Sequence, residues 1–504
     1  MRFEEYVGFD AVGLAELVRT GQVTADELLD VAFERTDATD EAIAAVVHRR
    51  EGTARRLIAD GLPDGPFRGV PFLMKDLGCE AVDFPTSMGS RLFDGHRWTY
   101  DSEIYSRMLA TGVVPFARTT SPEFGIGPTT ESAVYGRPTR NPWDTGRVVG
   151  GSSGGSGAAV AAGIVPMAHG SDGGGSVRIP ASHCGLFGLK PTRALLPDGP
   201  ESGEGWAGMA IDGFLTRSVR DTAVMVDAVA GTDLGAPYSA PSSPPVQVVA
   251  GTARHVAPSW PEGGSLADAI TRPPRRLRVA FTTGTLDGGT IHPECVAAVE
   301  HTAHLLESLG HEVLPVEPQV PMEAFMRAWT TIVASGTQAT VEAGARVKGL
   351  DPHDLDGLVD HVERVALLAC EMGRGISGAR YIDALATVHA AGRQFARFLL
   401  PYDVLLSTTM GEPPAEIGRF ATSRSDAWDT FLGYRLDHVL PYSPVTALAN
   451  GTGQPAITLP LWTSADGLPV GTHVMGRAGD DALLLQLAAQ LEAAEPWFHH
   501  RPVL

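Results

Sequence analysis

The alternation of apolar and polar positions along the chain predicts an α/β fold. Thr24-Ala-Asp-Glu27 has the form of a capping box, and the apolar residues after it recur at helical spacing, which predicts a helix. Short apolar runs at 69–78, 277–281 and 312–316 have the length of buried strands, and a helical pattern fills 293–309. Strands that alternate with helices are typical of a sheet covered by helices.

The pattern changes three times in the middle of the chain. Residues 150–157 are all Gly or Ser and predict a loop. Ala158–Ala162 predict a tightly packed helix of small residues, and Ile164–Met167 predict a strand. A second glycine cluster, Gly173–Gly175, directly precedes Ser176.

Two long segments interrupt this α/β pattern. Residues 232–275 are rich in Pro, Ala, Gly and Ser and predict a surface excursion, whereas residues 320–400 are mostly helical and predict a lobe over a site. The segment after residue 400 returns to the α/β pattern. Because no repeat with a period of 20 to 50 residues is present, a single domain over residues 1–504 is expected.

Composition narrows the classes of partner. The 504 residues carry a formal net charge of −20, which repels phosphate backbones and anionic lipids, so a small-molecule substrate is expected and nucleic acid or a membrane surface is not. The first residues have no secretory pattern, and four scattered cysteines without a CxxC pair favour a reduced, cytoplasmic setting. No HExxH motif is present, and no metal or cofactor is expected. The oligomeric state stays open, a homodimer included.

Lysine is rare in this chain. Of 39 basic residues, 36 are Arg, and only Lys75, Lys190 and Lys348 are Lys. A lysine can lose its proton, whereas an arginine in practice cannot. Lys75 follows the apolar run Val70–Met74, so burial is expected to lower its pKa, although a surface lysine with a packed stem is the alternative. Lys190 is interpreted as structural and Lys348 as solvated.

The glycine-rich segments allow several interpretations. Residues 150–157 could be a linker or a phosphate loop, and G-x-S-x-G would make Ser153 a nucleophile. The three glycines before Ser176 could aim backbone N–H groups at an oxyanion or could form a simple turn. Asp172 could hold this loop by accepting N–H bonds and could pair with Arg178.

Together these motifs resemble the signature of the amidase signature family. The resemblance rests on Gly150–Gly163, on Gly170–Ala181 and Cys184–Thr192, and on the lysine segment Gly69–Asp76. The core signature spans about 69–192, and the resemblance covers nearly the whole chain. It implies an α/β/α sandwich with a central mixed, twisted sheet flanked by helices and a helical insertion.

The resemblance also implies a Ser-cisSer-Lys triad. Ser176 would be the nucleophile, Ser152, after a cis peptide bond, the bridging serine, and Lys75 the base. The interval of 24 residues between Ser152 and Ser176 fits the spacing of the family and selects Ser152 over Ser153. Ser153 would instead support the loop, together with Asp172 and Arg178. The oxyanion hole would use the N–H groups of Gly173, Gly174, Gly175 and Ser176. Gly173 stands where most members carry Thr, so a looser oxyanion loop is expected.

The substrate prediction follows from the same resemblance. Three segments are most similar to the branch of the family that hydrolyses cyclic nylon oligomers of 6-aminohexanoate: Thr139–Asp144, Gly155–Gly157 and Met167–Gly170. The expected pocket residues are small or apolar, with few groups to fix a charged substrate: Gly125, Ile126, Gly127, Trp329, Ile332 and Val333. An amide hydrolase for neutral, largely apolar amides, linear or cyclic, is therefore favoured. The alternatives are a carbamate (urethane) or aryl-ester hydrolase, a glutamine-dependent amidotransferase subunit, and a binding protein on an inactive scaffold.

Overall fold

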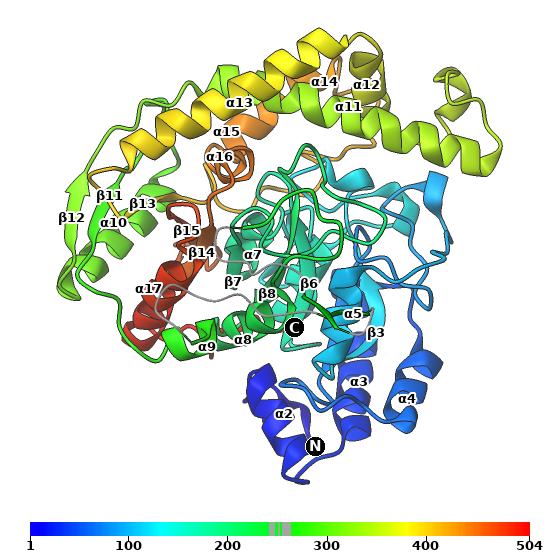
Figure 1. Cartoon of the computed structure of the whole chain (residues 1–504), viewed down its shortest axis with the longest axis vertical. Helices are drawn as coiled ribbons and strands as arrows, with labels where there is room; N and C mark the ends of the chain where they lie inside the picture. Colours follow the sequence, from blue (N-terminus) through cyan, green and yellow to red (C-terminus); the bar gives the residue numbers. More distant parts are fainter. Residues whose placement is uncertain (241–246, 250–251, 255–263) are drawn as a thin grey trace.

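A computed structural model of the chain has an eleven-stranded mixed sheet at its centre (Figure 1). The structure describes residues 1–240, 247–249, 252–254 and 264–504. The strand order is β1-β3-β2-β6-β8-β7-β14-β15-β13-β11-β12. In that order the strands are Val46–Val47, Val114–Thr119, Pro71–Lys75, Met167–Asp172, Ile211–Thr216, Phe187–Lys190, Ala456–Thr463, Pro469–Met475, Val404–Thr408, Arg278–Phe281 and Glu312–Pro315. Two small pairs, β4 (Arg140–Asn141) with β5 (Asp144–Val148) and β9 (Gln247–Val249) with β10 (Thr252–Arg254), lie apart from it.

The direction of the strands places the ends of β2 and β6 together. β2 runs parallel to both β3 and β6, and β11 runs parallel to β12 and β13, whereas the other neighbours in the sheet are antiparallel. Parallel neighbours have their carboxyl ends at the same edge of the sheet, which is where ligands bind in many α/β folds. Lys75 ends β2 and Asp172 ends β6, so two residues far apart in the sequence meet at this edge.

Alternate residues of the strands enter two different cores. Leu406 of β13 and Val474 of β15 belong to one hydrophobic cluster, whereas their neighbours Leu405 and Met475 belong to another. This follows from the period of two in a β-strand, which points successive side chains to opposite faces. Both faces of the sheet are therefore covered, and the predicted α/β/α sandwich is confirmed.

The helices divide between the two faces. The core on the first face takes side chains from α2 (Ala11–Arg19), α5 (Glu103–Ala110), α8 (Val219–Val229), α9 (Leu266–Ala269), α10 (Pro293–Ser308) and α17 (Asp481–Ala494). On the opposite face, the core beside β2 and β6 takes them from α4 (Glu51–Asp60), α6 (Gly154–Ala161) and α7 (Arg178–Cys184). Helix α3 (Ala25–Ile43) contributes to both cores.

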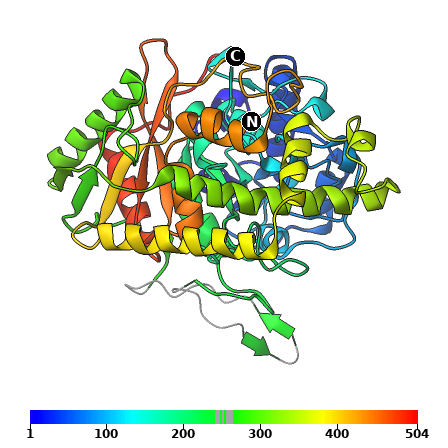
Figure 2. The same ribbon diagram turned by 90° about the horizontal axis from the view of Figure 1, so that it is seen from above.

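A layer of long helices covers the other half of this second face. It contains α11 (Met322–Lys348), α12 (Arg364–Arg374), α13 (Gly378–Phe398) and α16 (Thr446–Thr452), with the short α14 (Phe431–Gly433) and α15 (Leu440–Tyr442) beside them. Figure 2 shows α11 and α13 extended side by side across the sheet. The span predicted as a helical lobe, 320–400, contains the first three of these helices. The predicted surface excursion, 232–275, lies partly outside the described residues.

Two boundaries differ from the sequence prediction. The capping box at Thr24 begins α3 as predicted, with Thr24 accepting from the Glu27 N–H and Glu27 accepting in return. Helix α6, however, begins at Gly154, inside the predicted loop, and β6 begins only at Met167. The glycines are helical because close packing leaves no room for a side chain: a Cβ on Gly155 would lie 2.4 Å from the Thr120 backbone nitrogen. Among the described residues, no helix combines the length and apolar character that crossing a membrane would need.

Candidate active site

Lys75 ends β2 with its amine in a small group of hydroxyls. Its Nζ lies 2.6 Å from Ser152 Oγ, 2.9 Å from Ser171 Oγ and 3.4 Å from the Ser171 carbonyl oxygen. Lys75 and Leu73 are two residues apart in the same strand, so both point to the face covered by α6. Ser171, from the end of β6, carried no role in the sequence prediction.

Burial makes this amine unusual. The Lys75 side chain is 0% exposed, and burial lowers its pKa to about 7, against the opposing influence of the carboxylates of Asp172 and Asp212. A charged ammonium would lose its hydration here, which favours the neutral form. Close to neutral pH, Lys75 is therefore able to hold or release a proton.

The two predicted serines line one cavity. Ser152 follows a cis peptide bond with Gly151, as the resemblance implied, and both Ser152 and Ser176 line a cavity of about 230 Å³. The Ser153 N–H donates to the Ser176 carbonyl at 3.1 Å, which ties the two loops together. Among the described residues no hydrogen bond joins the Ser152 and Ser176 hydroxyls.

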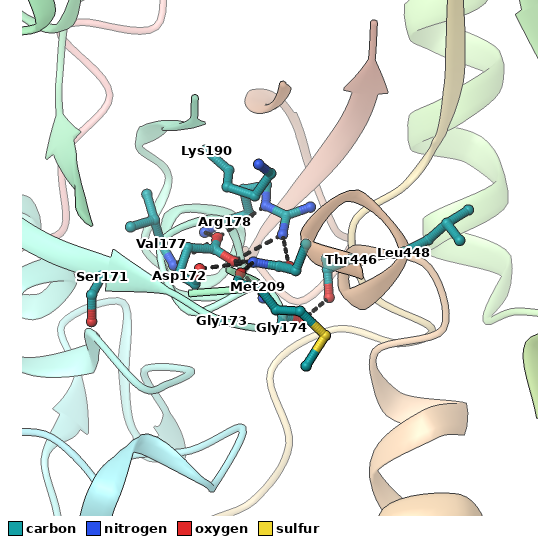
Figure 3. Close-up of polar contacts among 12 residues, drawn as sticks. Ser171, Asp172, Gly173, Gly174, Val177, Arg178, Lys190, Met209, Thr446 and Leu448 are labelled. Carbon is teal, nitrogen blue, oxygen red and sulfur yellow. Dashed lines mark hydrogen bonds and ion pairs between the residues drawn. The ribbon is translucent and has the colours of Figure 1, made fainter. Parts of the chain in front are cut away.

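A buried ion pair anchors the loop that carries Ser176 (Figure 3). Arg178 Nε and Nη2 donate to the Asp172 carboxylate at 3.0 and 2.9 Å, and both side chains are 0% exposed. Asp172 also accepts from the N–H groups of Gly175 and Val177, and Asn450 of α16 donates to its carboxylate at 2.9 Å. Burial alone would raise the pKa of Asp172, but the charge and hydrogen bonds of Arg178 hold that pKa well below its usual value. The carboxylate thus stays ionised and fixes the loop.

The glycine carbonyls of this loop are bound on its far side. Trp329 Nε1 donates to the Gly173 carbonyl at 3.3 Å, and Thr446 Oγ1 donates to the Gly174 carbonyl at 2.6 Å. The N–H and C=O of a trans peptide point in opposite directions, so the first contact turns the Gly174 N–H away from Trp329. The Gly175 N–H already donates to Asp172 at 2.7 Å, which corrects its predicted place in the oxyanion hole. The N–H groups of Gly173, Gly174 and Ser176 have no partner among the described residues.

Trp206 fills the space beside Gly173. A Cβ at Gly173 would lie 2.7 Å from Trp206 Cζ3, and one at Gly336 would lie 2.7 Å from Trp206 Cδ1. The indole also meets that of Trp329 edge to face, with centroids 5.7 Å apart. The prediction of a looser loop is therefore wrong, because an aromatic ring occupies the place that a side chain at Gly173 would take. Nothing in the local pattern around Trp206 indicated this packing.

Half of the predicted pocket residues line the cavities around Ser176. Gly125 lines the larger of the two cavities that Ser176 lines, and together with Gly127 and Trp329 it also lines the smaller one. The other three predicted residues line neither cavity, because their side chains are buried in the core beneath the helical layer: Ile126, Ile332 and Val333. They were predicted from their apolar character, which a core position explains equally well.

The large cavity is more polar than predicted. Its lining includes three acidic residues, Glu80, Asp198 and Asp212, which come from three separate places in the chain. The prediction of few charged groups is therefore wrong for this cavity. Glu80 follows β2 by five residues and Asp212 belongs to β8, but Asp198 lies in the long connection before β8, whose course the sequence pattern did not define.

The other two lysines differ from Lys75. Lys190, at the end of β7, is buried with a pKa lowered to about 7 by burial, and its Nζ donates to the Pro191 carbonyl at 2.6 Å. It lines neither cavity around Ser176. Lys348 is exposed at the end of α11.

The α/β sandwich, with a buried lysine and two serines beside a glycine-rich loop, defines the chain as a hydrolase of the amidase signature class. The chain belongs to the Amidase family, whose model matches residues 27–485, and is an enzyme that cleaves amide C–N bonds. It is similar to 6-aminohexanoate-cyclic-dimer hydrolase of Paenarthrobacter ureafaciens, 36% identical over 501 residues that cover 98% of this chain and 96% of that protein. The protein of the same name from Pseudomonas sp. (strain NK87) has the same identity and coverage. A solved structure of 6-aminohexanoate cyclic dimer hydrolase superposes with a TM-score of 0.87 at 34% identity, covering 98% of this chain and 99% of the other.

Removal of the Asp172 carboxylate should destabilise the whole protein. In Asp172→Ala, Arg178 keeps a fully buried charge without its partner, a change that costs about 3 to 5 kcal/mol. The free energy of unfolding in urea should fall by that amount. The exposed Asp466→Ala serves as control and should change it by less than about 0.5 kcal/mol. Equal stability of the two variants would show that the ion pair does not hold the fold.

A side chain at residue 173 should displace Trp206. Gly173→Thr places atoms against the indole, so overpacking of about 1 to 3 kcal/mol should disturb the cavity and lower kcat/KM by roughly tenfold or more. Tryptophan fluorescence should shift in the same variant. Adding Trp206→Ala should restore part of the activity relative to Gly173→Thr alone. Wild-type kinetics in Gly173→Thr would mean that Trp206 does not confine the loop.

Proposed function

We propose that this chain hydrolyses small amides through an acyl-enzyme formed on Ser176, with Ser152 and Lys75 as the proton relay. The contact that carries the proposal is the 2.6 Å hydrogen bond between Lys75 Nζ and Ser152 Oγ in a fully buried position. A histidine is not needed for this chemistry, because a neutral amine can act as the base.

The surroundings of Lys75 suit a neutral amine. A neutral –NH₂ group has two N–H donors and one lone pair. The Ser171 hydroxyl and carbonyl oxygens can accept the two donors, which leaves the lone pair for the hydroxyl hydrogen of Ser152. In this arrangement Ser152 Oγ is free to accept the proton of Ser176. The two serine hydroxyls would come into contact when substrate binds, as catalytic hydrogen bonds often tighten only in the complex.

The loop beside Ser176 can stabilise the tetrahedral intermediate. The N–H groups of Gly173, Gly174 and Ser176 are the proposed oxyanion donors, and one such donor is typically worth about 3 kcal/mol. Ser176 Oγ forms a bond to the amide carbon as its proton passes to Ser152 and the Ser152 proton passes to Lys75. The relay then returns a proton to the leaving amine as the C–N bond breaks. Water adds to the acyl-enzyme by the same relay and releases the acid.

The lining of the large cavity supports small amides with an apolar carbon chain. Leu77, Met88, Ile104 and Phe124 line it together with Trp206. The relatives named above are designated hydrolases of a cyclic amide, so a cyclic dimer of an aliphatic amino acid is a first substrate to test. Release of amine should be followed for this compound beside linear amides, carbamates, aryl esters and glutamine. Glutamine or a carbamate as the best substrate would overturn this substrate assignment.

Substitution of the proposed triad should separate catalysis from loop support. Ser176→Ala should lower kcat by about 10⁴-fold or more. Lys75→Ala should lower kcat by nearly as much, because losing one member of a catalytic unit can cost about as much as losing all of them. Ser153→Ala should cost less than about tenfold, because within the described part of the chain Ser153 Oγ forms hydrogen bonds only with the backbone of Ser171, at 3.2 Å. A fluorophosphonate should label the wild type at Ser176. Near-normal turnover by Ser176→Ala would refute the assignment.

The pH profile should report the state of Lys75. Because the base must be neutral, kcat/KM should fall tenfold for each pH unit below about 7, where Lys75 becomes protonated, and should level off above it. Lys190→Met provides the matched control, since Lys190 is buried with a similarly lowered pKa. The acidic limb should stay near pH 7 in that variant. If the acidic limb disappeared in Lys190→Met, the titration would belong to Lys190 and not to Lys75.

A further inference from the structure

Three acidic residues line the cavity that contains Ser176. Glu80 follows β2, Asp198 lies in the connection between β7 and β8, and Asp212 is the second residue of β8. None of the described residues that line this cavity is Lys, Arg or His. The lining therefore has a negative formal charge, and the nearby positive side chains of Arg118 and Lys75 lie outside it.

Two of these carboxyl groups have no ionic partner. Asp212 contacts His169 Nε2 at 3.1 Å, but neither Glu80 nor Asp198 forms an ion pair with a described residue. Burial raises the pKa of Glu80, and burial together with repulsion from Asp212 raises the pKa of Asp198 to about 7. Carboxylates that are partly buried and close to one another are destabilised as anions, and a positive group between them removes that cost.

The acidic residues share one cavity with the proposed reaction site. It contains Ser152 and Ser176, so whatever reacts at Ser176 lies within the same enclosure. A second polar group is also unmatched: the Thr337 hydroxyl on α11 lines this cavity, is 1% exposed as a side chain and has no hydrogen-bond partner. Buried polar groups are normally paired, so an unpaired one indicates an absent partner.

A metal ion does not fit the wall. In the part of the chain that the structure describes, no three His, Cys, Asp or Glu side chains converge as metal ligands. The volume of about 230 Å³ is below the range of about 300 to 1,000 Å³ typical of drug-sized ligands, which suits a short chain. Apolar side chains, among them Leu77, Ile104 and Phe124, line the remainder. An organic cation on a short aliphatic chain combines these features.

We infer that this enzyme prefers, over neutral amides such as the cyclic dimer, an amide that carries a protonated amine separated from the scissile bond by a short aliphatic chain, and that Glu80, Asp198 and Asp212 bind its ammonium group. The inference rests on the proposed amide hydrolysis at Ser176 and adds the charge of the substrate. An ammonium group has three N–H donors, so it can contact more than one carboxylate at once. Asp198 and Glu80 then act as specificity-determining residues.

Matched amides test the charge preference. The panel pairs 6-aminohexanoyl p-nitroanilide with hexanoyl and 5-carboxypentanoyl p-nitroanilide, and pairs N-(5-aminopentyl)hexanamide with N-pentylhexanamide, so that the amine stands on either side of the scissile bond. In at least one of the two pairs, the ammonium compound should exceed its neutral counterpart in kcat/KM by at least about tenfold. The carboxylate compound should be the poorest substrate. Neutral compounds that react as fast as their ammonium counterparts in both pairs would overturn the inference.

Variants of the wall test which residues recognise the amine. Asp198→Asn and Glu80→Gln should each reduce the ammonium preference to about threefold or less. Each preference is a ratio measured on one preparation, so partial misfolding affects both rates equally. Glu204→Gln is the matched control, because Glu204 lies on the same connection but is exposed and outside the cavity lining. A preference unchanged in both wall variants, or lost equally in Glu204→Gln, would overturn the assignment.

The same experiment separates this inference from the function on which it rests. Hydrolysis of none of the five amides, or equal hydrolysis by Ser176→Ala, would contradict the proposed amide hydrolysis. Hydrolysis that depends on Ser176 but ignores the amine would contradict only the charge preference. Asp212 is left unchanged because it contacts His169, whose Nδ1 accepts the backbone N–H of Lys75 at 3.3 Å. Substitution of Asp212 would therefore disturb the proton relay as well.

Discussion

The buried pair of Asp172 and Arg178 connects the segments that form the active site. Asp172 ends β6, Arg178 begins α7, and Asn450 of α16 contacts both side chains. A second guanidinium contact reaches His473 Nε2 of β15 at 2.8 Å. Each segment arrives from a different part of the chain, and two fully buried charges tolerate little separation. This pair therefore sets the course of the loop between Asp172 and Arg178, and with it the position of Ser176.

The same pair influences the charge on Lys75. The carboxylate of Asp172 acts to raise the pKa of Lys75, yet burial prevails and the pKa falls to about 7. Arg178 is fully buried beside Asp172 and offsets much of its negative charge. Without that compensation, the carboxylate would stabilise an ammonium at residue 75. The loop anchor thus serves two purposes, because it fixes the geometry of Ser176 and permits a neutral amine nearby.

Local pattern predicted those parts of the molecule that local forces determine. The capping box at Thr24 and the buried run ending at Lys75 follow from hydrogen bonding and apolar periodicity within a few residues. The roles of Ser152 and Ser176 came from resemblance alone, since a glycine-rich tract by itself allowed several interpretations. The start of α6 at Gly154 was missed because intrinsic propensity disfavours glycine in a helix, whereas the close approach of Gly155 to the Thr120 backbone requires a glycine there.

The cavity wall could not be predicted for a related reason. Trp206 and Asp198 belong to the connection between β7 and β8, which has no periodic pattern. The position of Trp206 depends on packing against Trp329 of the helical layer and against Gly173. Ile332 and Val333 show the converse error, since apolar side chains on α11 face the core beneath the layer as readily as a pocket. Patterns within one segment define which side chains are buried, but not which distant segment buries them.

Asp212 joins the cavity wall to the relay. Its carboxylate lies in the lining, contacts His169 next to the Lys75 backbone, and acts with Asp172 to raise the pKa of Lys75. A substrate ammonium bound at the wall would offset that negative charge, and by Coulomb's law it would disfavour a second positive charge on Lys75. Binding of the proposed substrate would therefore shift Lys75 further toward the neutral form that accepts a proton. In this scheme the positive charge that the wall recognises on the substrate also prepares the base that accepts the proton of Ser176 through Ser152.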